Sequence, residues 1–556
     1  MPNYDVVRPS SPTTHHIPLV ELSRDNQDAP STTTKTTTTT TTTTTSSSSS
    51  SSSPSSSSTT RSYSQECDGQ RRDDLQYNVH GYALEYPDDS SFCEKVLTQF
   101  ILTTLPSFLQ PFLGGEPSKP AKLHDIAALD GLRGWACLLV FNFHFLFTYT
   151  WQVSIGWGFN GENFGLHQLP IFHLLISGHV MVAIFFIISG YVLSYRPLRM
   201  IRSRSWDQTL TVLASSTFRR ALRLYIPSIV GTFLVFVGVR AGFYDYSHIV
   251  LNDGHTVTGT NEQHPPILKT FGAQFWDWYR TVVLLINPWD WNLYYNNYNP
   301  HLWTIPVEFR SSLVLFLTIL GTSRMKPAMR MLVVSGLTVF CVRWGRWEMV
   351  LFLSGLLLAE VDQINGIWSH PVLGEKPNDP SFFARPNSRA FWITVLVVGL
   401  FIGSSPNVGM KFTPGYMWLA RLTPETYPEP HRFPQTIGAI LIVCSINNSK
   451  TIQKLFTNQV SQYLGNISYS FYVVHGPILH SVGYSIMPSI WAVTGKQTNY
   501  QFCLGLLMGW LVCFPVSLWA GDIFWRMVDI PSVKFARWLE SKIVLKAGDP
   551  PLLPRS

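Results

Sequence analysis

The stretch DGLRGWACLLVFNFH, residues 130–144, decides the fold because it sets Arg133 and His144 within one apolar segment. That segment, about residues 127–151, is long enough to cross a bilayer as a helix. Eleven helical steps bring His144 back to within about 20° of Arg133, about 16 Å further along the axis. Because ionisable groups in hydrocarbon are costly, two on one face favour a protein-lined or water-lined interior and a catalytic histidine. The alternative is a packing histidine together with an arginine that reaches the membrane interface.

The composition is typical of polytopic membrane proteins. Of 556 residues, 46% are hydrophobic and only 13% are charged, whereas soluble proteins contain about 25% charged residues. The fold class that we predict is an all-α polytopic membrane protein with about ten transmembrane helices. The aromatic segment Phe275–Ile286 is either an eleventh span or a re-entrant segment. The candidate spans lie at about residues 127–151, 175–196, 222–240, 302–320, 329–343, 347–363, 390–405, 434–448, 462–484 and 501–522.

The N-terminal part of the chain differs sharply from the rest. Residues 1–91 contain no spanning segment and begin without a secretory signal. Within them, residues 31–60 are all Ser or Thr except Lys35 and Pro54, a composition that cannot bury a core. The predicted organisation is a disordered tail over 1–91, an interfacial segment over 92–122, a transmembrane domain over 123–540 and a C-terminal tail over 541–556.

Basic residues are distributed unevenly between the predicted loops. The loop between the second and third spans carries seven arginines, whereas residues 152–174 contain no Lys or Arg. By the positive-inside rule, the arginine loop and the N terminus lie in the cytosol. The net charge of +7 follows from this topology and indicates no nucleic-acid partner. We therefore predict an integral, multi-pass protein of an endomembrane or the plasma membrane, with a cytosolic N terminus.

This orientation places Arg133 near the cytosolic face and His144 near mid-depth. Guanidinium groups suit a phosphate-bearing ligand because they stay charged and form paired hydrogen bonds to phosphate oxygens. Arg219, Arg220 and Arg223, at the start of the third span, are further candidates for such a ligand, with plain topology signalling as the alternative. The seven cysteines include no close CxxC pair, so the sequence indicates neither a disulfide framework nor a metal site.

Two further stretches combine ionisable and apolar residues. In HLWTIPVEFR, residues 301–310, His301 and Glu308 share a helical face if Pro306 does not break the turn. Glu308 is then either half of a structural ion pair or a catalytic residue. In YLGNISYSFYVVHGP, residues 463–477, His475 lies one turn after Tyr472 and is a rival to His144 as the catalytic base. The hydroxyl groups of this stretch alternatively bond one helix to another.

Six motifs in this order resemble the acyltransferase-3 family of integral-membrane acyltransferases, in particular its fungal branch. The motifs are LDGLRG with the downstream His144, the segment from Ser177 to Tyr191, FRRALRLYIP, HLWTIPVEF, FLSGLLLAE and YLGNISYSFYVVH. The resemblance covers about residues 123–539 and implies transfer of an acyl group, often acetyl, from cytosolic acyl-CoA to a hydroxyl group. In this family the arginine and histidine of the first span are tied to activity, which here means Arg133 and His144.

The resemblance implies a reaction and a set of partners. We expect His144 to deprotonate the acceptor hydroxyl while Arg133, about 16 Å away, binds the phosphates of the coenzyme. We expect no bound cofactor, with acetyl-CoA as co-substrate, a hydroxylated small molecule as acceptor and the lipid bilayer as surroundings. The lack of a hydrolase-like domain after the last span favours a small acceptor, and the fungal resemblance favours a secondary metabolite. The alternatives are acylation of a cell-surface glycan or lipid, a transporter with a His/Glu proton relay, and a membrane scaffold.

Overall fold

The structure is a computed structural model that describes residues 104–110, 123, 126–364 and 388–544. The predicted disordered tail, residues 1–91, lies outside the described residues. So does most of the predicted interfacial segment, residues 92–122. The predicted C-terminal tail, residues 541–556, is described only in its first four residues. Throughout the described part the chain is helical and contains no β-strand. The α-helices are α2 (Ala127–Phe147), α3 (Gly178–Arg202), α4 (Trp206–Arg240), α5 (Asp245–Asp253), α6 (Phe271–Leu285), α7 (Thr304–Thr322), α8 (Pro327–Arg343), α9 (Trp347–Ile364), α10 (Ser388–Gly403), α11 (Met417–Leu422), α12 (Arg432–Asn448), α13 (Lys450–Gln453), α14 (Gln459–Ile478), α15 (Tyr484–Thr494), α16 (Asn499–Phe524) and α17 (Ile530–Ile543).

Short 3₁₀ and π turns connect several of these helices. The 3₁₀ turns are η2 (Trp151–Ser154), η3 (Phe159–Gly161), η4 (Leu166–Gln168), η5 (Phe172–Ile176), η6 (Pro300–Trp303) and η8 (Met410–Phe412). The π turns η9 (Leu479–Gly483) and η10 (Trp525–Asp529) continue α14 and α16 without a break. Two of these turns, η6 and η9, carry histidines of the site described below.

A helix occupies every segment that the sequence predicts to span, and most boundaries agree within a few residues. Within the described part of the chain, four helical stretches are long and apolar enough to cross a membrane: Gly178–Arg202, Trp206–Arg240, Pro300–Thr322 and Asn499–Ile543. The helical fold is therefore confirmed, while the number of about ten spans stays a prediction.

The predicted arginine loop is the clearest difference from the sequence analysis. Only residues 203–205 separate α3 from α4, and α4 continues for 35 residues as one helix. Arg219, Arg220 and Arg223 therefore lie inside a helix, not in a loop. Hydropathy marks where a helix becomes apolar, whereas the helix itself continues as long as no residue breaks it.

The segment left open in the sequence, Phe275–Ile286, lies within the 15-residue helix α6 except for Ile286, which caps its C-terminal end. At 1.5 Å per residue α6 is about 22 Å long, which is shorter than the hydrocarbon core of a bilayer. It packs against α4, where Nε1 of Trp278 donates to Oγ1 of Thr232 at 3.2 Å, while Trp276 and Tyr279 are exposed. The length of α6 favours an interfacial or re-entrant segment over an eleventh span.

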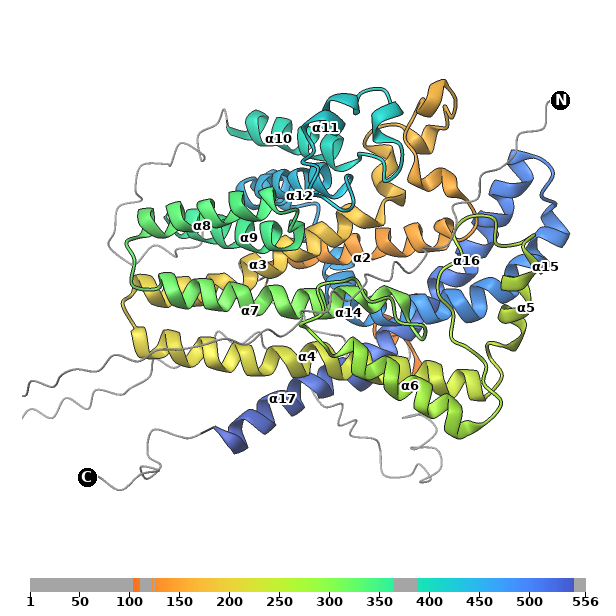
Figure 1. The fold of residues 1–556 in the computed structure, drawn as a ribbon, viewed down its shortest axis with the longest axis horizontal. Helices are drawn as coiled ribbons and strands as arrows, with labels where there is room; N and C mark the ends of the chain where they lie inside the picture. Colours follow the sequence, from red (N-terminus) through yellow and green to blue (C-terminus); the bar gives the residue numbers. More distant parts are fainter. Residues whose placement is uncertain (1–103, 111–122, 124–125, 365–387, 545–556) are drawn as a thin grey trace, which may run out of the picture. The chain divides into compact units, whose positions relative to one another are not determined.

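Close helix pairs build the core around α2, α3, α9 and α14 (Figure 1). Gly134 of α2 faces Gly465 of α14 so closely that a Cβ on Gly134 would lie 2.5 Å from the backbone nitrogen of Gly465. Gly190 of α3 and Gly355 of α9 meet in the same way. Small residues at such contacts allow helix backbones to approach in membrane proteins. The first contact fixes α2, and with it Arg133 and His144, against α14.

Candidate active site

The ring of His144 lies in the last turn of α2, beside a carboxylate from a distant loop. Nδ1 of His144 lies 2.9 Å from Oε1 of Glu262, in the connection between α5 and α6. Because a carboxylate oxygen only accepts, Nδ1 carries the proton and Nε2 is left with its lone pair. No other described residue forms a hydrogen bond with Nε2 of His144. This is the arrangement that a general base requires.

The loop that carries Glu262 is attached to the end of α2 by its backbone. The amides of Gly259 and Thr260 donate to the carbonyls of Thr148 and Phe147, each at 2.9 Å. These carbonyls lie at the C-terminal end of α2, where a helix leaves its last acceptors unpaired. A Cβ on Gly259 would overlap the carbonyl of Phe147, so the contact needs glycine. Glu262 follows two residues after Thr260, so these backbone hydrogen bonds place its carboxylate beside the ring of His144.

Glu262 also contacts two further histidines. Its Oε2 atom lies 3.2 Å from Nε2 of His301 in η6 and 3.4 Å from Nε2 of His480 in η9. The three histidine rings therefore surround one carboxylate, although they come from three separate parts of the chain. The side chain of His144 is 15% exposed, whereas His301 is 2% and His480 3% exposed. Of these rings, His144 is the one that a substrate reaches most easily.

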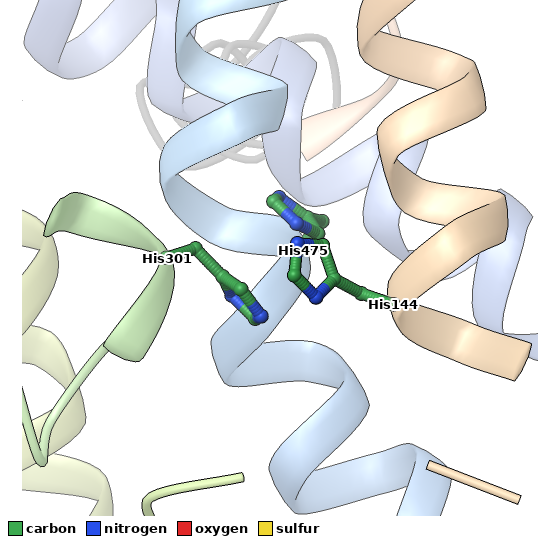
Figure 2. A group of neighbouring side chains, drawn as sticks. All are labelled: His144, His301 and His475. Carbon is green, nitrogen blue, oxygen red and sulfur yellow. The ribbon is translucent and has the colours of Figure 1, made fainter. Parts of the chain in front are cut away.

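His475 of α14 completes the cluster. Figure 2 shows His144, His301 and His475 converging from α2, η6 and α14, and their ring centroids lie 3.8 to 5.6 Å apart. Nδ1 of His475 donates to the backbone carbonyl of Tyr472 at 2.7 Å, so its Nε2 also keeps a lone pair. That Nε2 is buried and has no hydrogen-bond partner among the described residues. One ring nitrogen from each of the three histidines lies within 4.8 Å of the others.

The π turn η9 carries His480, which contacts the same carboxylate as His144 and His301. His480 lies five positions after His475, and a regular helix would place them about 140° apart around its axis. The wider turn of η9 (Leu479–Gly483) rotates the chain less per residue and changes this direction. Such turns occur frequently at functional sites in helices.

The electrostatics of the cluster favour an ionised Glu262. Burial alone would raise the pKa of Glu262, but the rings of His144 and His301 outweigh it and hold this pKa well below its ordinary value. The carboxylate therefore stays charged and keeps the proton of His144 on Nδ1.

Arg133 occupies the opposite end of α2 from His144. Its Nε donates to Oγ of Ser468 and its Nη2 to the carbonyl of Gly465, both at 2.9 Å. A further ion pair joins it to Asp130 at 3.3 Å. Since α2 is one continuous helix, about 16 Å separate Arg133 from His144.

The arginines of α4 are paired with acidic residues of other helices. Arg220 forms an ion pair with Glu308 of α7 at 2.6 Å, and Ser189 donates to the same carboxylate oxygen at 2.8 Å. Arg219 lies 3.2 Å from Glu540 of α17. Arg223 and Arg133 both act electrostatically on the carboxylate of Asp529 in η10. Arg223 and Arg133 therefore belong to one region of the fold.

The structure thus brings together only some of the residues predicted from the sequence. His144, His301 and His475 meet in one cluster, whereas Glu308 faces Arg220 and not His301. Glu262 and His480 were not predicted. Glu262 stands in a polar loop with no periodic pattern, so the sequence carries no signal for it. His480 lies in a predicted span, and its position within an apolar segment was a usable signal.

Comparison with known proteins gives one family and several relatives. Residues 126–526 match a family described as an acyltransferase domain. The O-acetyltransferase PaAT-1 of Phomopsis amygdali is 30% identical over 464 residues, which cover 80% of this chain and 90% of that protein. The acyltransferase R4 of a Phoma species is 26% identical, over 75% of this chain and 96% of its own length. The acyltransferase clz18 of Cochliobolus lunatus is 25% identical, over 73% and 93%. No solved structure matches the chain.

Proposed function

This chain belongs to the acyltransferase-3 family, and we propose that it transfers an acetyl group from acetyl-CoA to a hydroxyl group of a small molecule within the membrane. The observation that carries this proposal is the 2.9 Å contact between Nδ1 of His144 and Glu262, which leaves Nε2 of His144 as a base. The name of the Phomopsis relative, an O-acetyltransferase, supports acetyl as the group and oxygen as the acceptor atom.

The reaction needs one proton to move twice. Nε2 of His144 takes the proton of the acceptor hydroxyl as its oxygen attacks the thioester carbonyl carbon. The new carbon–oxygen bond forms, the carbon–sulfur bond breaks, and the leaving thiolate takes the same proton back from His144. Between these two steps Glu262 stabilises the imidazolium form of His144, because its negative charge lies next to Nδ1, the other ring nitrogen. His475 is a second candidate for contact with the reacting atoms, since its free Nε2 faces the cluster.

The donor is proposed to enter from the end of α2 that carries Arg133. Arg133 and Arg223 lie in one region, and Arg219 and Arg220 stand on the same helix as Arg223. Guanidinium groups at this end match the phosphates of a coenzyme A molecule. An extended pantetheine arm then spans the distance of about 16 Å along α2 and brings the thioester to His144.

The acceptor is proposed to be a secondary metabolite with a free hydroxyl group. A buried cluster with one partly exposed histidine suits a small, largely apolar molecule better than a polymer.

The direct test is an assay of the purified full chain in detergent. We expect it to release free thiol from acetyl-CoA only when a hydroxylated acceptor is present, and the product to gain the mass of one acetyl group. The His144→Ala variant should be inactive, while a His167→Ala variant, which alters an exposed histidine of η4, should retain activity. Thiol release without an acylated product, or normal turnover by His144→Ala, would contradict the proposal.

A further inference from the structure

We propose that Glu262, His301 and His480 bind a divalent transition-metal ion of the zinc type, directly beside the base His144. The three ligand atoms are Oε2 of Glu262 and Nε2 of His301 and of His480. One ligand atom from each residue lies within 4.8 Å of the others. Two histidines and one carboxylate form a common ligand set for zinc sites that keep one position open.

The distances around Oε2 of Glu262 are compatible with ligands that share one ion. Oε2 lies 3.2 Å from Nε2 of His301 and 3.4 Å from Nε2 of His480. A hydrogen bond from a ring N–H to a carboxylate is typically about 2.7–2.9 Å long, as His144 shows at 2.9 Å on the other oxygen. Ligands bound tetrahedrally to zinc at about 2.0–2.2 Å are about 3.3–3.6 Å apart. The two longer distances lie close to that separation.

The proton positions around His480 point to the same conclusion. The hydroxyl of Ser247 donates to the carbonyl of Tyr244 at 2.9 Å and therefore accepts from Nε2 of His264 at 3.3 Å. With its proton on Nε2, a neutral His264 has a lone pair on Nδ1. Nδ1 of His480 lies 3.3 Å from this atom and must donate to it. The Nε2 atom of a neutral His480 then presents a lone pair to Glu262.

His301 presents its Nε2 atom to the same carboxylate. Its Nδ1 and Oδ1 of Asn299 are both buried without a hydrogen-bond partner among the described residues. Both atoms face the Cα of Gly476: a Cβ there would overlap Nδ1 of His301 and lie 3.1 Å from Oδ1 of Asn299. The amide of Asn299 is fixed because its Nδ2 donates to Val473 at 2.8 Å. Nδ1 of His301 has no partner there among the described residues, so Nε2, at 3.2 Å from Oε2 of Glu262, is the ring atom that faces the proposed ion.

The carboxylate of Glu262 and Nε2 of His480 thus face each other as two acceptors, with Nε2 of His301 beside them. Such an arrangement is unfavourable unless a cation lies among them, since buried acceptors need a donor or an ion. A divalent ion satisfies all three atoms at once. Hydrogen bonds from Nδ1 of His480 to His264, and from His144 to the second oxygen of Glu262, then orient the ligands, as outer-shell partners do in known metal sites.

Metal content of the purified full chain, measured by elemental mass spectrometry, tests this proposal without turnover. We expect about one zinc ion per chain after incubation with zinc and removal of excess metal. His480→Ala and Glu262→Gln should each weaken zinc binding at least about tenfold. His475→Ala, which removes a histidine of the neighbouring cluster, is the matched control and should retain the ion. Substitution by Co²⁺ should give the visible absorption of a tetrahedral site in the wild type and not in His480→Ala.

Two results would overturn the proposal. A folded, monodisperse chain that binds no zinc would show that the network holds an additional proton. Loss of zinc in His475→Ala together with full binding in His480→Ala would assign the ion to His144, His301 and His475 instead. His144→Gln separates this proposal from acyl transfer, since we expect it to be inactive and still to bind metal. An active wild type without metal would therefore contradict the metal site alone.

Discussion

The two ends of α2 use charge in opposite ways. At one end, Arg133 is held by α14 through Ser468 and Gly465 but stays 28% exposed, and the nearby Arg219 and Arg220 of α4 lie beside carboxylates. At the other end, His144, His301 and His480 surround the single carboxylate of Glu262, and His475 packs against the rings of His144 and His301. Here several ring nitrogens lack a hydrogen-bond partner among the described residues.

We infer that this difference separates donor binding from proton transfer. An arginine held in place by neutral and acidic groups keeps its charge and presents it to an anionic ligand at a fixed position. A neutral histidine with one nitrogen anchored and the other free can accept a proton. The same helix thus connects a region suited to a donor's phosphates with a region suited to proton transfer, about 16 Å apart.

The largest effect should come from His144. We expect His144→Gln to lower kcat by about a thousandfold, because proton transfer by a positioned side chain contributes about 10²–10⁴. Thermal unfolding in detergent should be nearly unchanged, since the ring is partly exposed. The assay is acetyl transfer to a fixed acceptor, with His167→Gln as the control. A loss of less than tenfold would move the base to His475.

A smaller loss is expected for Glu262→Gln. The amide keeps the size of the side chain but removes the charge that holds the proton of His144 on Nδ1. We expect kcat to fall about a hundredfold with little change in either KM. Glu425→Gln, at an exposed glutamate, provides the comparison. If only the KM of the acceptor rises, Glu262 contacts the acceptor and does not orient His144.

Arg133→Lys tests the other end of α2. Lysine keeps the positive charge but loses the planar group that contacts Ser468 and Gly465 together. We expect the KM for acetyl-CoA to rise about tenfold, while the acceptor KM stays within about twofold. Steady-state kinetics with each substrate varied in turn measure both values. A change confined to the acceptor KM would break the proposed division between the two ends.

The smallest effect on turnover is expected at Glu308, which the sequence left open between catalysis and an ion pair. Its carboxylate is paired with Arg220 and Ser189. We expect Glu308→Gln to lower the free energy of unfolding by about 1–3 kcal/mol, because it leaves the charge of Arg220 without its partner. Turnover per folded molecule should stay within about threefold. Thermal unfolding and kinetics on the same sample measure both, and a thousandfold loss of kcat would instead place Glu308 at the reacting atoms.

The helices and the central histidine could be predicted from the sequence because both signals are local. Apolar runs of spanning length predicted helices that the structure contains, and the eleven-residue spacing placed Arg133 and His144 on one helix. His301 and His475 stood out for the same reason, as ionisable residues in apolar segments. The arginine segment was wrongly predicted as a loop, since hydropathy does not mark where a helix begins.

What only the tertiary structure decided is which of these residues meet. Glu262 lies 118 residues after His144 and reaches it because the loop bonds to the open end of α2. His480 reaches the same carboxylate through a π turn that no 3.6-residue period describes. Glu308 meets Arg220 and not His301, because α4 packs against α7 (Figure 1). Helical periodicity fixes directions along one helix, whereas the partners of a charge come from other segments and depend on how the helices pack.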